Sequence, residues 1–268
     1  MQGTSYIVTY RCSSDPLRRA NLDAVLGWLR TLNLPEVVVV EQDVAPTLGD
    51  LTPFPGLRVV FAYNPGPFNK SWGFNIGVRQ SKGSLLAFGD ADIICPSFPD
   101  AVAASRSGVA VVRAFQGVID LDEAMSAKLR RDPRVLSKPG FGPGPADRQG
   151  IGEHVPLCGG LVLFERRYLT LLGGWDERFL GWGGEDDAMT IKVQRSGLPF
   201  GIKDTADGVH LFHRRAADAH KDAPHYRANL ALLAQLRNLP DASLKRLSEV
   251  SWFLAGNQDR LRPVEPLA

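Results

Sequence analysis

The segment SLLAFGDADII, residues 84–94, joins an apolar run directly to two carboxylates. Residues 84–88 have the length and the continuous apolar content of a strand that is buried on both faces of a parallel sheet. Asp90 and Asp92 follow at once, where the expected strand ends. Open α/β sheets bind their ligands at the carboxyl ends of the strands. The segment therefore predicts a strand of such a sheet and, beside it, a functional site.

The chain before this segment alternates strand and helix signals. Leucine and valine residues recur at helical spacing between residues 16 and 32, and residues 37–40 are four consecutive valines. The alternation predicts a doubly wound α/β fold with a mostly parallel sheet, whose site residues follow the strands that end near residues 10, 40 and 88. Strands are expected near 5–10, 37–40, 57–61 and 84–88, and helices near 16–32 and 71–80.

The later part of the chain contains a glycine- and proline-rich stretch and two helix-like segments. Residues 137–152, SKPGFGPGPADRQGIG, show no hydrophobic period, which predicts a loop. A domain linker is the alternative. We favour a surface or active-site loop, because the strongest motifs lie on both sides of it and should meet across one cleft. Helices are expected over 226–236 and 243–254, where they cap the domain or form a contact surface.

Composition excludes several classes of protein. A length of 268 residues with 44% hydrophobic content is sufficient for a large buried core, which excludes a disordered chain. The balance of 31 basic against 29 acidic residues gives a formal charge of +2, so no overall field favours nucleic acid as a partner. Three widely spaced cysteines are typical of a reducing compartment. Without a signal-peptide pattern or an apolar run of about 18 residues, we expect a cytoplasmic protein with no transmembrane segment.

Two carboxylates and two histidines predict a metal site. Asp90 and Asp92 alone are weak evidence, because aspartates after a strand also form turns with their own backbone. Late in the chain, however, His210 and His213 stand three residues apart among apolar residues. Imidazole completes the transition-metal sites that carboxylates begin, so we expect Mn²⁺ or Mg²⁺ here. His213 is the favoured imidazole ligand and His210 the second.

A second acidic motif, FLGWGGEDDAM at residues 179–189, begins an expected helix that runs to about residue 195. Acidic residues in a first helical turn favour the helix dipole, which alone explains one or two of the three. It does not explain Trp182 held between glycines, an arrangement that suits close approach of the backbone to a ligand and stacking of the indole. A carboxylate at this place can accept the proton of an attacking hydroxyl.

The motif Gly181-Trp182-Gly183-Gly184-Glu185-Asp186-Asp187 resembles that of the β-1,4-galactosyltransferases and related GT-A enzymes. That group includes bacterial chondroitin polymerases and polypeptide N-acetylgalactosaminyltransferases. FNKSWGFNIG at residues 68–77 is similar to the family helix before Asp-x-Asp, and residues 41–43 are similar to its second-strand exit. Residues 159–160 precede an apolar stretch where the family has a Gly-Gly strand. The resemblance covers roughly residues 5–215.

The resemblance implies a GT-A fold, with a Rossmann-like, mostly parallel central sheet flanked by helices and a short C-terminal helical extension. It implies one domain over residues 1–268, divided into a nucleotide-binding half (1–95), an acceptor and catalytic half (96–223) and C-terminal helices (224–268). The first strand exits as YRCSS, residues 10–14, rather than as the Pro-Phe-Arg type of the family, so recognition of the base need not follow the family.

Roles carried over by position are expectations. The resemblance implies that Asp186 is the general base, that Asp92, His213 and His210 hold the metal ion, and that Asp90 contacts the metal ion or the ribose. Trp182 would close over the donor sugar, and Lys70 would replace a family arginine near the diphosphate. Residues 214–223 would form a lid that orders when donor binds. Acceptor binding is assigned to Glu185, Trp182, Asp187 and Gly160, and donor binding to Thr9, Tyr10, Arg11, Glu41, Asp43, Lys70, Asn75, Asp90 and Ala91.

The expected activity is transfer of a hexose or N-acetylhexosamine from a UDP-sugar to a glycan or other hydroxyl acceptor. Family members whose motif ends Glu-Asp invert the anomeric centre, so Asp186 favours inversion. The alternatives are a retaining transferase of the same fold, a catalytically idle sugar-nucleotide-binding subunit of a polysaccharide assembly, and a metal-dependent nucleotidyltransferase or phosphatase. The chain is similar to compact bacterial transferases, which leaves open a peripheral association with a membrane-bound assembly.

Overall fold

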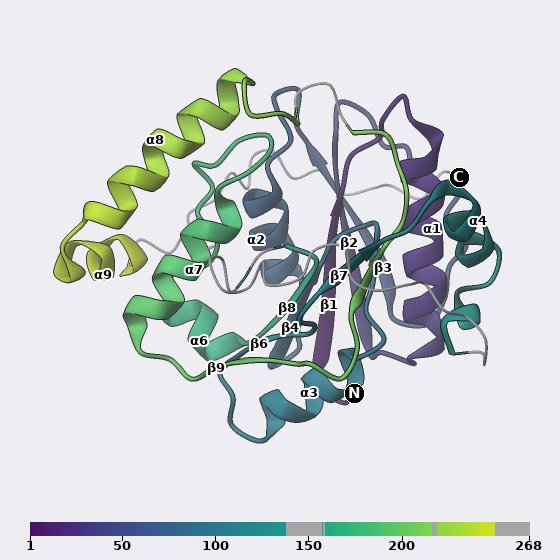
Figure 1. Ribbon diagram of the computed structural model, residues 1–268, viewed down its shortest axis with the longest axis horizontal. Helices are drawn as coiled ribbons and strands as arrows, with labels where there is room; N and C mark the ends of the chain where they lie inside the picture. Colours follow the sequence, from purple (N-terminus) through teal and green to yellow (C-terminus); the bar gives the residue numbers. More distant parts are fainter. Residues whose placement is uncertain (138–156, 158, 216–218, 250–268) are drawn as a thin grey trace.

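The computed structural model describes residues 1–137, 157, 159–215 and 219–249. Within them the central feature is a sheet of seven strands in the order β3-β2-β1-β4-β8-β6-β9. A smaller sheet has the order β5-β10-β7. Helices cover the central sheet on both sides (Figure 1). The α/β fold class that the alternating pattern predicts is confirmed.

The first half of the chain builds the parallel part of the sheet. β1 pairs with β2 and β4, and β2 pairs with β3, all in parallel. All residues of β1 are buried, as a strand covered on both faces requires. The expected strands and helices are all present, with bounds that differ from the predicted ones by at most three residues. They are β1 (Thr4–Tyr10), α1 (Pro16–Thr31), β2 (Glu36–Asp43), β3 (Leu57–Tyr63), α2 (Lys70–Gln80) and β4 (Leu85–Gly89).

The second half extends the sheet with mixed strands. β8 (Leu161–Glu165) is antiparallel to both β4 and β6 (Val111–Arg113), and β9 (Phe200–Ile202) lies parallel to β6 at the edge. In the small sheet, β10 (Gly208–His210) is antiparallel to β5 (Ile93–Ile94) and parallel to β7 (Val118–Asp120). β10 therefore places His210 beside the segment directly after β4.

Two hydrophobic cores lie on opposite faces of the central sheet, because alternate residues of each strand point to opposite sides. Tyr6 and Val8 of β1 belong to the core with α1 and α3 (Phe98–Arg106). Ile7, between them, belongs to the core with α2 and α7 (Glu185–Ser196). The remaining helices of this part are α4 (Glu123–Arg131), a 3₁₀ turn (Pro133–Ser137) and α6 (Arg166–Leu171).

The C-terminal helices α8 (Pro224–Asn238) and α9 (Asp241–Glu249) pack on α7 (Figure 1). The first matches the helix expected over residues 226–236. The second begins close to the expected position, and the rest of the predicted segment to residue 254 lies outside the described residues, as does the loop from residue 138 to 152. In the described part of the chain, no helix has both the length and the apolar character needed to cross a membrane.

Candidate metal and carboxylate site

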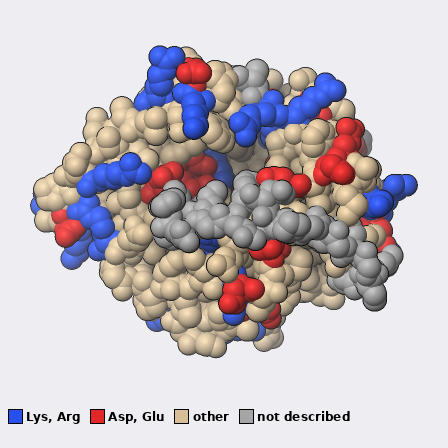
Figure 2. All heavy atoms as spheres, in the orientation of Figure 1, with Lys and Arg blue, Asp and Glu red and all other residues tan. Residues whose placement is uncertain are grey.

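The site lies where β4 ends and the small sheet begins. On the face drawn in Figure 2, acidic side chains gather around a central hollow, and basic side chains stand at its border. Two groups of functional side chains meet here. One contains Asp92 with two histidines, and the other contains Lys70 with several carboxylates.

Asp92, His210 and His213 form the first group. The described residues contain one cluster of this kind, whose ligand atoms all lie within 4.8 Å of one another. His213 Nε2 is 3.0 Å and His210 Nε2 is 3.9 Å from Asp92 Oδ2. One carboxylate and two imidazoles at this spacing match the donor set of a transition-metal site.

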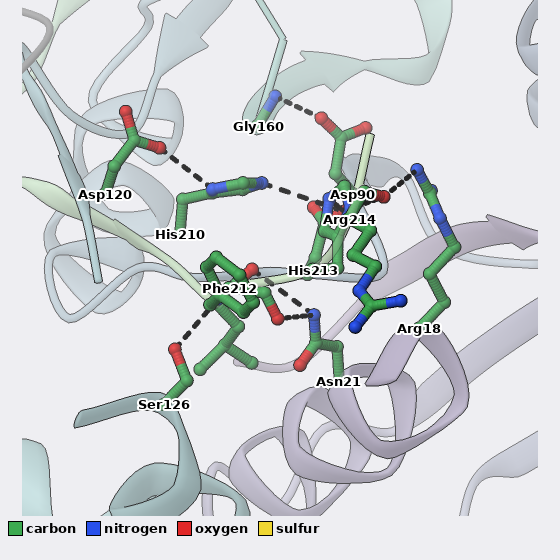
Figure 3. Close-up of polar contacts among 12 residues, drawn as sticks. Arg18, Asn21, Asp90, Asp120, Ser126, Gly160, His210, Phe212, His213 and Arg214 are labelled. Carbon is green, nitrogen blue, oxygen red and sulfur yellow. Dashed lines mark hydrogen bonds and ion pairs between the residues drawn. The ribbon is translucent and has the colours of Figure 1, made fainter. Parts of the chain in front are cut away.

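In each histidine of this group, a contact of the ring nitrogen Nδ1 orients the imidazole (Figure 3). His210 Nδ1 lies 2.9 Å from Asp120 Oδ1, and His213 Nδ1 lies 2.9 Å from the carbonyl oxygen of Arg214. Because a carbonyl oxygen only accepts, His213 carries its proton on Nδ1 in the neutral ring. When a metal ion is bound, the proton on Nδ1 would leave the Nε2 lone pair free to ligate it, whereas without the ion the protonated His213 ring can donate from Nε2 to Asp92.

Strand pairing brings these distant residues together. His210 is the register partner of Ile93 in β5 and of Asp120 in β7. The amide of Leu211 donates to the carbonyl of Asp92 at 2.8 Å, which extends this pairing by one residue. Sequence reasoning missed Asp120, whose one available signal was its place as an acid at the end of a short apolar strand, residues 118–120.

Helices α1 and α4 hold the backbone between the two histidines. Asn21 Nδ2 lies 3.3 Å from the carbonyl oxygens of both Leu211 and Phe212, and the amide of Phe212 donates to Ser126 Oγ at 2.8 Å. Arg130 donates to Asn21 Oδ1 at 2.8 Å (Figure 3 draws Asn21, Ser126 and Phe212). Helix residues more than 80 positions away therefore keep His213 in place.

Asp92 and His213 stabilise each other's charged form. Burial alone would raise the pKa of Asp92, but its hydrogen bond with His213 and the nearby His210 hold the pKa below its usual value. The same hydrogen bond raises the pKa of His213. The carboxylate therefore stays ionised, in the form that binds a cation.

Lys70, the first residue of α2, organises the second group. Its Nζ is 2.9 Å from Asp90 Oδ1 and 3.6 Å from both Glu185 Oε1 and Asp186 Oδ2. Burial would lower the pKa of Lys70, but Asp186, Asp90 and Glu185 together raise it well above its usual value. Asp90 lies outside the cluster of Asp92 and the histidines, because its carboxylate binds Lys70 and, at 2.8 Å, the amide of Gly160.

Asp186 stands in the first turn of α7, which begins directly after Gly184. Gly184 has a φ of 96°, a left-handed conformation that favours glycine. Asp186 Oδ2 accepts the amide of Gly159 at 2.8 Å. Burial raises the pKa of Asp186 to about 7, with Glu185 and Asp90 adding to the rise and Lys70 opposing it. A carboxyl group with this pKa exchanges protons readily near neutral pH.

Trp182 is 42% exposed, and its indole stacks on Tyr226 of α8 with ring centroids 5.0 Å apart. The guanidinium of Arg215 lies 5.9 Å from the centre of the indole. Asp187 Oδ1 lies 3.6 Å from a guanidinium nitrogen of Arg237. At Gly160, which has a φ of 93°, an added Cβ would lie 2.5 Å from the ring of Phe115. Glycine is therefore required there by both conformation and space.

Most of the side chains expected to bind the nucleotide make contacts within the protein, near the ends of the strands. Asp43 and Ala91 are partly exposed. Arg11 donates to the carbonyl oxygens of Gln42, Asn64 and Gly66 at 2.7 to 2.9 Å. Four more of them are buried: Thr9 accepts a hydrogen bond from Gln42, Tyr10 lies in the core, Glu41 binds Thr47, and Asn75 holds the backbone of Trp175.

A family model described as the N-terminal domain of galactosyltransferase matches residues 153–214. This segment contains Gly160, the motif at residues 181–187 and both histidines of the metal group. Among curated protein sequences, none matches the chain.

Solved structures of glycosyltransferases are similar to this fold. A Drosophila β-1,4-galactosyltransferase 7 with xylobiose has a TM-score of 0.50 and 14% identity, with 85% of this chain and 79% of that chain covered. Glucosyl-3-phosphoglycerate synthase from Mycobacterium tuberculosis with Mn²⁺, UDP and phosphoglyceric acid has a TM-score of 0.57 and 17% identity, covering 89% and 80%. GalNAc-T7 with UDP, GalNAc and Mn²⁺ has a TM-score of 0.55 and 15% identity, covering 94% and 55%. The chain therefore has the GT-A fold, and its residues 153–214 are similar to the galactosyltransferase family.

Proposed function

We propose that the chain is a Mn²⁺-dependent glycosyltransferase that moves a hexose or N-acetylhexosamine from a UDP-sugar to the hydroxyl of a glycan or similar acceptor. One observation carries the proposal. A carboxylate with two imidazoles, Asp92 with His210 and His213, lies two residues along the chain from Asp90, which shares Lys70 with Asp186. A candidate cation site and a partly buried proton acceptor are thus linked through Asp90 and Lys70, at the edge where such folds bind ligands.

The donor set fits a transition metal better than Mg²⁺. Two imidazole nitrogens and one carboxylate suit Mn²⁺, whereas Mg²⁺ favours oxygen ligands and retains its waters. The synthase and GalNAc-T7 named above were both solved with Mn²⁺ and UDP, which supports the same choice here. An ion bound by this group would neutralise the charge of the departing diphosphate.

Asp186 is the proposed general base. It would accept the proton of the acceptor hydroxyl as that oxygen attacks the anomeric carbon and the bond to the diphosphate breaks. The amide of Gly159 and the ammonium of Lys70 hold the carboxylate in one orientation. Attack opposite to the leaving group inverts the anomeric centre. A product with the donor's own configuration would identify the retaining alternative instead.

Ligand binding tests the proposal directly. A thermal-shift panel of UDP, GDP and their sugars, with and without Mn²⁺, should show stabilisation by UDP-sugars that requires the ion, because a ligand that binds only the folded state raises its apparent stability. Mg²⁺ at the same concentration should give a smaller shift. Equal stabilisation with and without the metal would contradict the proposed site, and release of sugar without any transfer to acceptors would favour a hydrolase.

Asp120→Asn tests the orientation of His210. The amide can present its NH₂ group to Nδ1, which favours the wrong tautomer for a metal ligand. We expect Mn²⁺ affinity, measured by titration calorimetry, to fall by about 10- to 100-fold, the usual effect of an outer-shell partner. Asp100→Asn, on α3, is the matched control and should keep wild-type affinity. Unchanged affinity in Asp120→Asn would remove His210 from the proposed ligands.

The pH profile should report Asp186. Its pKa is raised to about 7, and the base form is the ionised one, so kcat/KM should increase with pH below about 7 and level off above it. Lys70 opposes this rise, so in Lys70→Met the acid limb should move to higher pH. The exposed Lys82→Met serves as control and should leave the profile unchanged. An acid limb that stays in place in Lys70→Met would show that another group limits the rate.

A further inference from the structure

Helix α8 packs against α7, which begins within the acidic motif at residues 179–189 (Figure 1), and part of this contact is apolar. Leu233 and Leu236 are buried against Phe179 and Ala188. These side chains account for attachment of the helix to α7. They do not account for the polar and aromatic residues that α8 places closer to its N-terminus, directly over the glycine-rich part of the motif.

Asn229 is the first of these residues. It is 3% exposed, and its side chain uses both of its functional atoms on the motif backbone. Nδ2 donates to the carbonyl oxygens of Leu180 at 2.8 Å and Gly183 at 2.7 Å, and Oδ1 accepts the amide of Leu180 at 3.2 Å. One buried amide therefore fixes the backbone on both sides of Trp182.

Tyr226, nearly one turn earlier on α8, contacts the same segment through its ring. It stacks on Trp182 with an angle of 24° between the planes. An added Cβ at Gly183 would lie 3.0 Å from ring carbons of Tyr226, and one at Gly181 would lie 3.3 Å from Cβ of His225. The glycines around Trp182 thus leave room for α8, a reason for them that the sequence did not suggest.

Ordering this glycine-rich segment costs conformational entropy, and it fixes the path by which the chain enters α7. Glycine loses more conformational entropy than other residues when it is fixed, and a buried amide is unfavourable unless its hydrogen bonds are made. Leucine at position 229 would have provided the apolar contact alone. Hydrogen bonds to Leu180 and Gly183 instead determine the path by which the chain enters α7 and hence where Glu185 and Asp186 point.

We propose that Asn229 and Tyr226 are positioning residues for the catalytic motif. Together they hold residues 180–184 in the conformation that directs Asp186 toward the acceptor hydroxyl, and they keep the exposed part of the indole available to a sugar. The proposal rests on the proposed glycosyltransferase function. A misplacement of the reacting group by about 1 Å costs on the order of 10²-fold in rate, so loss of this support is measurable.

Asn229→Leu and the neighbouring Leu230→Ala form a matched pair on α8. Leu230 is 44% exposed, so its truncation should leave every measured property within about twofold. Turnover is measured as transfer or hydrolysis of the UDP-sugar that gives the largest thermal shift, and binding as the affinity for Mn²⁺ and UDP. For Asn229→Leu we expect kcat to fall by about 10- to 100-fold while that affinity changes by less than about twofold. Equal loss of kcat and affinity would overturn the proposal, because it would indicate a general effect on the fold.

Fluorescence provides a readout that does not depend on turnover. Acrylamide quenching of Trp182, obtained as the difference from a Trp182→Phe background, should increase in Asn229→Leu and in Tyr226→Leu and stay at the wild-type level in Leu230→Ala. Unchanged quenching in both variants would overturn the proposal. If Asn229→Leu does not fold, Tyr226→Leu decides through the same kcat, affinity and quenching measurements. A wild-type chain without turnover would reject the proposed function, whereas quenching would still report whether α8 holds the indole.

Discussion

Asp186→Asn should lower the rate of sugar transfer by a factor of about 10² to 10⁴, because a positioned general base contributes this much to catalysis. The amide retains the size of the carboxylate and an oxygen that can still accept the amide of Gly159, but it cannot take up a proton at neutral pH. Affinity for Mn²⁺ and UDP should change by less than about threefold, since Asp186 lies in the Lys70 group and not among the atoms of the metal cluster. Steady-state kinetics and calorimetry measure the two quantities separately.

Asp23→Asn on α1 is the matched control for this substitution. Asp23 makes an ion pair with Arg19 on the surface, and its side chain is half exposed, so turnover and binding should both remain at wild-type levels. Equal loss of turnover and nucleotide binding in Asp186→Asn would indicate that Asp186 serves only as a structural acid at the start of α7. Full activity would exclude it as the base.

His213→Ala should remove Mn²⁺ binding and, with it, transfer. His213 is the imidazole closest to Asp92, and alanine removes its Nε2 from the cluster. Loss of a ligand atom should exceed the roughly 10- to 100-fold effect expected of an outer-shell partner such as Asp120. Calorimetric titration with Mn²⁺ measures the affinity, and added imidazole tests whether the missing ligand can be restored from solution.

His220→Ala is the control for His213→Ala. His220 is exposed and seven residues further along the chain, so its removal should not change Mn²⁺ affinity. If His213→Ala bound Mn²⁺ as tightly as the wild type, the group of Asp92, His210 and His213 would have to be rejected as the metal site. If binding fell but transfer did not, the ion would not take part in the reaction.

Asp186→Asn and His213→Ala test the two halves of the proposed site separately, the Lys70 group and the metal group. Asp90 and Asp92 stand two residues apart, yet the structure directs them to different partners. Asp92 faces the imidazoles, and Asp90 faces Lys70 and the amide of Gly160. Lys70 is thus surrounded by three carboxylates, and its predicted place near the diphosphate stays a prediction. Its positive charge compensates the acids around the proposed base.

Local sequence patterns determined the central strands and the residue types of the candidate metal site. The run of valines at residues 37–40 and the apolar residues 84–88 predicted buried parallel strands, because continuous apolar content suits strands covered on both faces. The pair Asp90 and Asp92 was expected at a strand exit for the same reason. His210 and His213 could be selected because two imidazoles three residues apart, in a chain that already offers the carboxylates of Asp90 and Asp92, suggest a metal site. These inferences depend on periodicity and residue chemistry, which the sequence displays directly.

Only the tertiary structure decided which partner each of these residues meets. Pairing of β10 with β5 and β7 places His210 beside both Asp92 and Asp120. β5 lies about 115 residues before β10 and β7 about 90, and no local pattern encodes the register between strands so far apart. The same holds for Asn229, which the sequence presents as an ordinary helix residue. In the structure its side-chain amide is buried and binds the backbone beside Trp182. Residue types and spacing determine what a side chain can do, whereas packing determines what it touches, and the proposed chemistry requires both.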